Sequence, residues 1–356
     1  VSKVMPEINS LTYRGYAAQD LCEYCRFEEV AYLILNKDLP NSIQLKKFEK
    51  QERDERELSK NLYEIIKNMP KNSHPMDVAR TAVSVMGLED KETSDSSPEA
   101  NMRKALRIFS KTPAALAAFY RIRDGKKIIK PKKTLTFAEN FFYMCFGKVP
   151  QKEIVKAFDV SLILYAEHSF NVSTFTARTI TSSLSDIHGA ITGAIASLKG
   201  PLHGGANEEV MHMMNKIKKP ENALKWIKDA LKNKDVVMGF GHRVYKSGDS
   251  RVPTMREYFG KVAKIKKDKK FEKIYDIIEK VMIKEKNIHP NVDYPTGPTY
   301  HLMGFDTDFF TPIFVISRIT GWSAHIMEQH AANKLIRPLA KYKGSKHRKV
   351  MELNYR

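Results

Sequence analysis

The stretch "FEKIYDIIEKVMIKEK" (residues 271–286) decides the fold class of this 356-residue chain. Its apolar side chains recur every three or four residues, at Phe271, Ile274, Ile277, Ile278, Val281 and Met282. This spacing places them on one face of an amphipathic helix and leaves the charged residues on the other face. The stretch therefore predicts a helix that packs on a core.

The same periodicity recurs along the chain, whereas alternating strand patterns are almost absent. Residues 45–69 are predicted as another helical stretch, with a heavily charged face, and residues 221–233 as a further helix. In "SKTPAALAAFYRI" (110–122), Thr112 is predicted to cap a helix that begins at Pro113. The sequence therefore predicts an all-α fold.

Breaks in the helical pattern divide the chain. A chain of 356 residues favours two domains over one. Breaks at Gly200-Pro201 and at residues 287–298 can bound a smaller domain between two parts of a larger one. We expect a large domain of residues 1–203 and 299–356 and a small domain of residues 204–298.

The net charge of +19, from 60 Lys and Arg against 41 Asp and Glu, is compatible with several partners. The lysines are spread along the chain, and no helix-turn-helix, zinc-finger or RNA-binding signature occurs. We interpret the charge as mostly solvated surface that also attracts anions, with no specific nucleic-acid partner. A basic helical scaffold or a nonspecific nucleic-acid binder is the alternative from another class.

The cysteines and apolar runs bear on the compartment. Three cysteines do not make a disulfide framework and are predicted as core residues of a protein in a reducing compartment: Cys22, Cys25 and Cys145. No apolar run reaches the length of a membrane span, and the N-terminal residues lack the apolar core of a signal peptide. These features do not support secretion or a membrane span.

His203 lies just before a predicted helix, in "GPLHGGANEEVMHMM" (200–214). Gly204 and Gly205 interrupt the backbone pattern, and the acidic residues after them suit a first helical turn. The positive end of the helix dipole disfavours an imidazolium ion, so a neutral His203 can donate a hydrogen bond to a carbonyl that becomes an enol. A histidine that only caps the helix is the simpler alternative.

Three more clusters can carry chemistry. "VVMGFGHRVYKSGDSR" (236–251) joins a Gly-x-Gly turn to His242, and "NVDYPTG" (291–297) places Asp293 in a predicted loop. The last cluster is a set of arginines able to bind carboxylates: Arg251, Arg318 and Arg337. Each residue alone also fits an ordinary turn or surface role. No H-E-x-x-H or G-x-S-x-G motif occurs, so neither a metal site nor a serine hydrolase is expected.

Taken in order, four motifs resemble the citrate synthase family: "GPLHGGANE", "GFGHRVYK.GD.R", "NVDYPTG" and "SRITGW.AHIMEQ.....LIRP". The resemblance continues through "YRGY", "RFEEVAYLIL", "HPMDVARTAVSVMG" and "LYAEHSFNVSTFTAR", so it covers nearly the whole chain. It is closest to the short bacterial type, which includes the 2-methylcitrate synthases. This resemblance implies a cytoplasmic protein, and the mitochondrial matrix, which the basic charge would also suit, is the alternative. The resemblance implies a mainly helical homodimer with a small domain that closes over oxaloacetate and an acyl-coenzyme A, without a metal or a tightly bound cofactor.

The resemblance also implies a role for each residue. Asp293 would remove a proton from the acyl-CoA thioester, His203 would stabilise the enol oxygen, and His242 would donate to the ketone of oxaloacetate. The oxaloacetate carboxylates would be held by Arg251, Arg318, His168 and, from the other subunit, Arg337. Coenzyme A would contact Val237, Met238, Gly239, Phe240, Gly241 and Lys246.

The sequence leaves the acyl group open. Citrate synthase, acting on acetyl-CoA, is the favoured function, and 2-methylcitrate synthase, acting on propionyl-CoA, is the alternative. One extra methylene is worth only about 1–3 kcal/mol in a pocket, so both thioesters can react.

Overall fold

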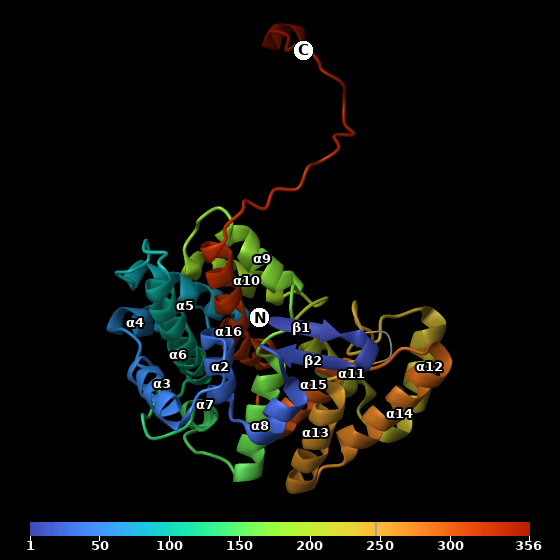
Figure 1. Ribbon diagram of the computed structural model, residues 1–356. Helices are drawn as coiled ribbons and strands as arrows, with labels where there is room; N and C mark the ends of the chain where they lie inside the picture. Colours follow the sequence, from blue (N-terminus) through green and yellow to red (C-terminus); the bar gives the residue numbers. More distant parts are fainter. Residues whose placement is uncertain (246–247) are drawn as a thin grey trace.

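The computed structural model describes residues 1–245 and 248–356, and helices dominate it (Figure 1). The first half of the described chain contains α1 (Ala18–Tyr24), α2 (Phe27–Asn36), α3 (Ser42–Asp54), α4 (Lys60–Asn68), α5 (Pro75–Glu89), α6 (Pro98–Arg123), α7 (Phe137–Phe146) and α8 (Lys152–Tyr165). The second half contains α9 (Val172–Thr181), α10 (Ile187–Leu198), α11 (Ala206–Ile217), α12 (Pro220–Asn233), α13 (Val252–Lys266), α14 (Lys270–Lys286), α15 (Asp293–Met303) and α16 (Phe310–Ala331). The all-α prediction is confirmed, as are the helices at 271–286 and 221–233.

A small antiparallel sheet at the N-terminus was not predicted. Its strands are β1 (Ser2–Met5), β2 (Ser10–Tyr13) and β3 (Tyr16–Ala17), and short 3-10 helices are η1 (Pro6–Ile8), η2 (Thr307–Phe309) and η3 (Leu353–Tyr355). Arg14 and Gly15 both have positive φ and form the two-residue turn between β2 and β3. Strands of two to four residues are too short to show an alternating pattern, which explains why the sequence did not reveal them.

The predicted helix start at Thr112 and Pro113 is wrong, because both residues lie inside the continuous helix α6. The helix begins with the same signals fifteen residues earlier, where Ser97 accepts a hydrogen bond from the N–H of Ala100 and Pro98 is the first helical residue. Pro113 removes one backbone donor, but both faces of the helix are buried around it. Tertiary packing therefore keeps the helix continuous.

Residues 45–69 form two helices instead of one. Helix α3 ends at Asp54 and α4 begins after its capping residue Ser59. Between them, the buried Arg56 forms an ion pair with Glu52 and donates to two backbone carbonyls near α7, those of Lys132 and Leu135. These distant contacts draw the chain away from the helix axis.

Helix α16 is the structural centre of the fold. Almost all of its side chains are buried, and it packs against α2, α6, α8, α9 and α10. Its face toward α8 carries Arg318. After Ala331 the chain leaves the helical body as an extended segment (Figure 1). The three cysteines are buried and free, as predicted for core residues.

Candidate active site

A cavity of about 710 Å³ collects most of the predicted site residues. Its walls come from the N-terminal strand, the turn after α8, the segments before α11 and α13, and the starts of α15 and α16. The predicted residues that line it are His168, His203, Val237, Met238, Gly239, Phe240, Gly241, His242, Arg251, Asp293 and Arg318. Lys246 lies outside the described residues. The fold thus brings together side chains from four separate motifs.

Asp293 is the first residue of α15 and lies half-buried in the cavity wall, rather than in a loop as predicted. One carboxylate oxygen, Oδ1, accepts a hydrogen bond of 2.6 Å from the hydroxyl of Tyr165. Burial raises the pKa of Asp293 to about 6, although the Tyr165 hydrogen bond and the charge of Arg251 both lower it. At neutral pH the group is an ionised carboxylate close to the pKa that suits a general base.

His203 precedes α11 by three residues, at the positive end of this helix, as predicted. Its Nε2 accepts a hydrogen bond from the backbone N–H of Ser173 at 3.3 Å and lies 2.8 Å from the Ser173 hydroxyl. Since a backbone N–H can only donate, the proton of the neutral ring lies on Nδ1. Burial, followed by the charge of Arg318, lowers the pKa of His203 to about 3. The ring is therefore a neutral hydrogen-bond donor.

His168 and Arg318 have polar atoms that lack protein partners. His168 Nε2 and Arg318 Nη1 are buried and have no hydrogen-bond partner among the described residues. Burial and the charge of Arg251 lower the pKa of His168, so the ring is neutral. Arg318 lies over the ring of Phe314 and donates through Nε to the carbonyl of Tyr165 at 2.6 Å. Buried polar atoms of this kind are costly unless a ligand binds them.

Arg251 is held differently, by a direct ion pair with Asp249. The guanidinium donates through Nε at 2.9 Å and Nη2 at 2.7 Å, and both residues are buried. Burial opposes its charge, but the Asp249 carboxylate outweighs burial and raises the pKa of Arg251. Nearby, His242 Nδ1 accepts from the N–H groups of Val244 and Tyr245, which leaves the proton of a neutral ring on Nε2.

The predicted coenzyme A segment, residues 237–241, exposes backbone to the cavity. Gly239 and Gly241 have φ of 82° and 80°, a conformation that favours glycine. A Cβ on Gly239 would lie 2.7 Å from a methyl group of Val210. The N–H of Gly241 donates to the carbonyl of His289 at 2.8 Å, which fixes this segment beside the chain that leads to α15.

Arg337 is the predicted site residue that the single chain does not bring to the cavity. It lies on the extended segment after α16 and is exposed. Sequence reasoning also missed several residues that shape the site: Tyr165, Ser173, Asp249 and the strand residues Ser2, Lys3 and Val4. Only Asp249 could have been found, from its position next to Arg251 in the predicted basic turn.

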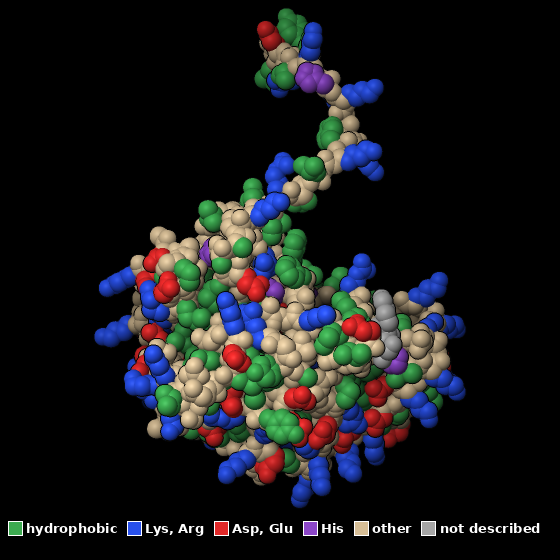
Figure 2. All heavy atoms as spheres, viewed as in Figure 1, with side chains coloured by type: hydrophobic (Ala, Val, Ile, Leu, Met, Phe, Trp, Pro, Cys, Tyr) green, Lys and Arg blue, Asp and Glu red, His purple; other side chains and the backbone are tan. Residues whose placement is uncertain are grey.

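The described residues contain no group of three or more His, Cys, Asp or Glu side chains that could hold a metal ion. In the same residues, no helix is long and apolar enough to cross a membrane. Lys and Arg side chains are scattered over the visible face of the molecule and along its C-terminal segment (Figure 2).

The helical fold and a cavity that combines an ionised carboxylate, neutral histidines and arginines define an enzyme that handles an anionic substrate. A family model described as "Citrate synthase, C-terminal domain" matches residues 1–339. The chain belongs to the citrate synthase family, whose members are acyltransferases.

The relatives of this chain are named for two different activities. The chain is 51% identical to a citrate synthase of Mycolicibacterium smegmatis over 99% of this chain and 93% of the relative. It is 50% identical to a 2-methylcitrate synthase of Mycobacterium tuberculosis (strain H37Rv) over 98% of this chain and 88% of the relative. It is also similar, with a TM-score of 0.94 and 31% identity over 100% and 96% of the two chains, to a Thermoplasma acidophilum citrate synthase solved with carboxymethyl coenzyme A and oxaloacetate.

Proposed function

We propose that this enzyme condenses acetyl-CoA with oxaloacetate and hydrolyses the thioester to release citrate and coenzyme A. The observation that carries the proposal is the joint placement of Asp293, His203 and Arg318, whose Nη1 has no partner among the described residues, around one cavity. An ionised base, a neutral donor and a buried cation are what proton abstraction beside a carbonyl and capture of a dicarboxylate require.

The proton transfer is assigned to Asp293 and His203. The Asp293 carboxylate takes a proton from the carbon next to the thioester carbonyl. His203 donates from Nδ1 to the carbonyl oxygen as negative charge develops there, because Ser173 occupies its Nε2. Because the imidazolium form of His203 has a low pKa, the ring stays neutral. Its remaining N–H then stabilises the enolate by a hydrogen bond.

Capture of oxaloacetate is assigned to the two arginines and the other histidines. Arg318 Nη1 supplies an unpartnered buried donor, His168 Nε2 an unpartnered buried polar atom, and Arg251 adds a second cation held by Asp249. His242 donates from Nε2 to the ketone oxygen as the new carbon–carbon bond forms. The backbone at 237–241 and Lys246 are proposed to hold coenzyme A.

The alternative acyl donor is propionyl-CoA, which would make the enzyme a 2-methylcitrate synthase. Relatives of both names are about half identical to the chain, at 51% and 50%. The deciding experiment measures free thiol released from acetyl-CoA and from propionyl-CoA, each with oxaloacetate. A larger kcat/KM for acetyl-CoA supports the proposal, a larger value for propionyl-CoA supports the alternative, and no thiol from either contradicts both.

We also propose that the enzyme is a homodimer in which Arg337 enters the partner's site. Exposed apolar side chains in and just after α9 support this, namely Val172, Phe175 and Leu184. The extended segment that carries Arg337 points away from its own helical body (Figure 1). Large exposed apolar residues on one face are typical of an interface.

Mixing two inactive variants tests the shared site. Arg337→Ala and Asp293→Asn chains should each be nearly inactive alone. After co-refolding, random pairing gives heterodimers in about half of the molecules, and each has one intact site, so about a quarter of the activity should return. If Arg337 served its own subunit, a verified heterodimer would recover no activity.

The domain division and the compartment stay proposals. We propose that residues 204–298, which contain α11 to α14, move as a small domain over the cavity and that the enzyme acts in the cytoplasm.

The basic charge is assigned to solvated surface. Tight DNA binding that persists at physiological salt would instead favour the nucleic-acid alternative.

A further inference from the structure

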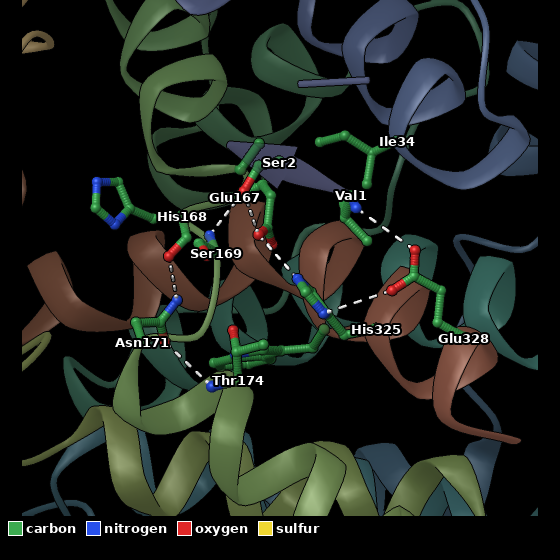
Figure 3. Close-up of polar contacts among 12 residues, drawn as sticks. Val1, Ser2, Ile34, Glu167, His168, Ser169, Asn171, Thr174, His325 and Glu328 are labelled. Carbon is green, nitrogen blue, oxygen red and sulfur yellow. Dashed lines mark hydrogen bonds and ion pairs between the residues drawn. The ribbon is translucent and has the colours of Figure 1, made fainter. Parts of the chain in front are cut away.

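Glu167 is a wholly buried carboxylate that the assigned chemistry does not use. It lies in the turn between α8 and α9, next to His168, and its side chain has no solvent exposure. Oε1 accepts a hydrogen bond from the Ser2 hydroxyl at 2.9 Å and lies 2.9 Å from His325 Nε2, whereas Oε2 has no partner among the described residues. In Figure 3 the ring of His168 points away from this group of contacts.

His325 does not neutralise this carboxylate. Its Nδ1 lies 3.0 Å from a guanidinium nitrogen of Arg178, which can only donate. Nδ1 is therefore an acceptor, and the neutral ring donates its one proton from Nε2 to Glu167. The contact between His325 Nε2 and Glu167 Oε1 is an ion pair only when the ring is protonated, and the acceptor role of Nδ1 makes it a hydrogen bond from a neutral ring. The described residues then place no Lys or Arg side chain within ion-pair distance of Glu167, although burial of an unbalanced charge is strongly unfavourable.

The helix beside Glu167 supplies the balancing charge at a distance. Gly321 admits the carboxylate against α16, since a Cβ at this position would clash with Oε2 of Glu167. Arg318 lies one turn earlier on α16 and therefore on the same face. Arg318 is buried, its Nε donates to a backbone carbonyl, and its Nη1 has no hydrogen-bond partner among the described residues. Burial lowers its pKa to about 10, and Glu167 is the largest influence that opposes this.

We propose that Glu167 is the separated counter-ion of Arg318, a positioning residue that keeps this guanidinium charged while leaving its outer nitrogen unpaired. A direct ion pair would occupy the donor that the substrate carboxylate needs. A carboxylate one layer behind the arginine balances the buried charge without competing for that donor. The proposal rests on the proposed function, in which Arg318 binds oxaloacetate.

Glu167→Gln removes the charge and keeps the shape and the acceptor for His325. Without ligand, the unbalanced Arg318 should lower the melting temperature by about 5 °C. Oxaloacetate then supplies the missing negative charge, so its stabilising effect should exceed that in the unmodified enzyme and recover about half of the loss. The KM for oxaloacetate should fall or stay constant, whereas a residue that only supports the fold would raise it.

Glu52→Gln is the matched control, because Glu52 is equally buried but pairs directly with Arg56, away from the cavity. Its stability loss should be the same with and without oxaloacetate. An oxaloacetate shift in Glu167→Gln no larger than in the unmodified enzyme would overturn the proposal.

A double-mutant cycle of stability, measured without ligand, tests separately whether the charges of Glu167 and Arg318 interact. If the two charges balance each other, the Glu167→Gln/Arg318→Gln double variant should be more stable than the sum of the single losses predicts. Additive losses would overturn the proposal. Failure of oxaloacetate to stabilise the unmodified enzyme would contradict the proposed substrate instead, and the cycle would still decide the role of Glu167.

Discussion

Arg251 and Arg318 line the same cavity, but their charges are balanced in different ways. Arg251 bonds through two nitrogens to Asp249, two residues before it in the chain. Arg318 has an unpartnered nitrogen in the described structure, and the buried Glu167 lies behind it on the same face of α16. The first arrangement favours a rigid cation, and the second favours a cation whose donor is available to a ligand.

Asp293 lines the same cavity as the two arginines, and its substitution is expected to change activity the most. It belongs to α15, on the Arg251 side, and is fixed by Tyr165, on the Arg318 side. Asp293→Asn should lower kcat by about 10³- to 10⁴-fold, because the amide cannot accept the proton, while calorimetry still detects oxaloacetate binding. Asp229→Asn, an exposed change on α12, is the control and should retain full activity. Near-normal thiol release from Asp293→Asn would contradict its role as the base.

Arg251→Leu tests whether the direct ion pair with Asp249 holds Arg251 in place. The loss of a buried cation should raise the KM for oxaloacetate by about a hundredfold, and the unpaired Asp249 should lower the melting temperature. Adding Asp249→Asn should restore stability but not affinity, as steady-state kinetics and thermal unfolding would show. If the double variant is no more stable than Arg251→Leu, the direct pair does not explain how Arg251 is held.

A smaller, pH-dependent effect is expected for Tyr165→Phe. The Tyr165 hydrogen bond lowers the pKa of Asp293, which burial holds at about 6. Without this bond the pKa rises, and the base is protonated over a wider acidic range. The acidic limb of the kcat/KM profile should move upward by up to about one pH unit, so that activity falls several-fold at pH 6 and little at pH 8.5.

Tyr300→Phe is the control for this shift. Its hydroxyl is also buried but contacts Ser161 instead of Asp293. An unchanged acidic limb in Tyr165→Phe, or an equal shift in both variants, would show that Tyr165 does not tune the base.

Local signals in the sequence determined the helical class and the position of His203. Apolar spacing predicts α12 and α14 because an amphipathic helix repeats within a few residues. Gly204, Gly205 and the acidic first turn mark the start of α11, so the position of His203 at the positive end of this helix follows from nearby residues. Its neutral state depends mainly on burial and on the charge of the distant Arg318. The order of four short motifs was enough to predict the family.

Only the tertiary structure decided how these groups are held. Tyr165 and Asp293 are 128 residues apart, and Glu167 and His325 are 158 residues apart, so no local pattern connects them. Burial also reversed two expectations: α6 continues through Pro113, and Asp293 begins a helix instead of lying in a loop. The physical reason is that sequence periodicity reports the preference of one segment, whereas burial, pKa and charge balance depend on which distant segments exclude water from the same space.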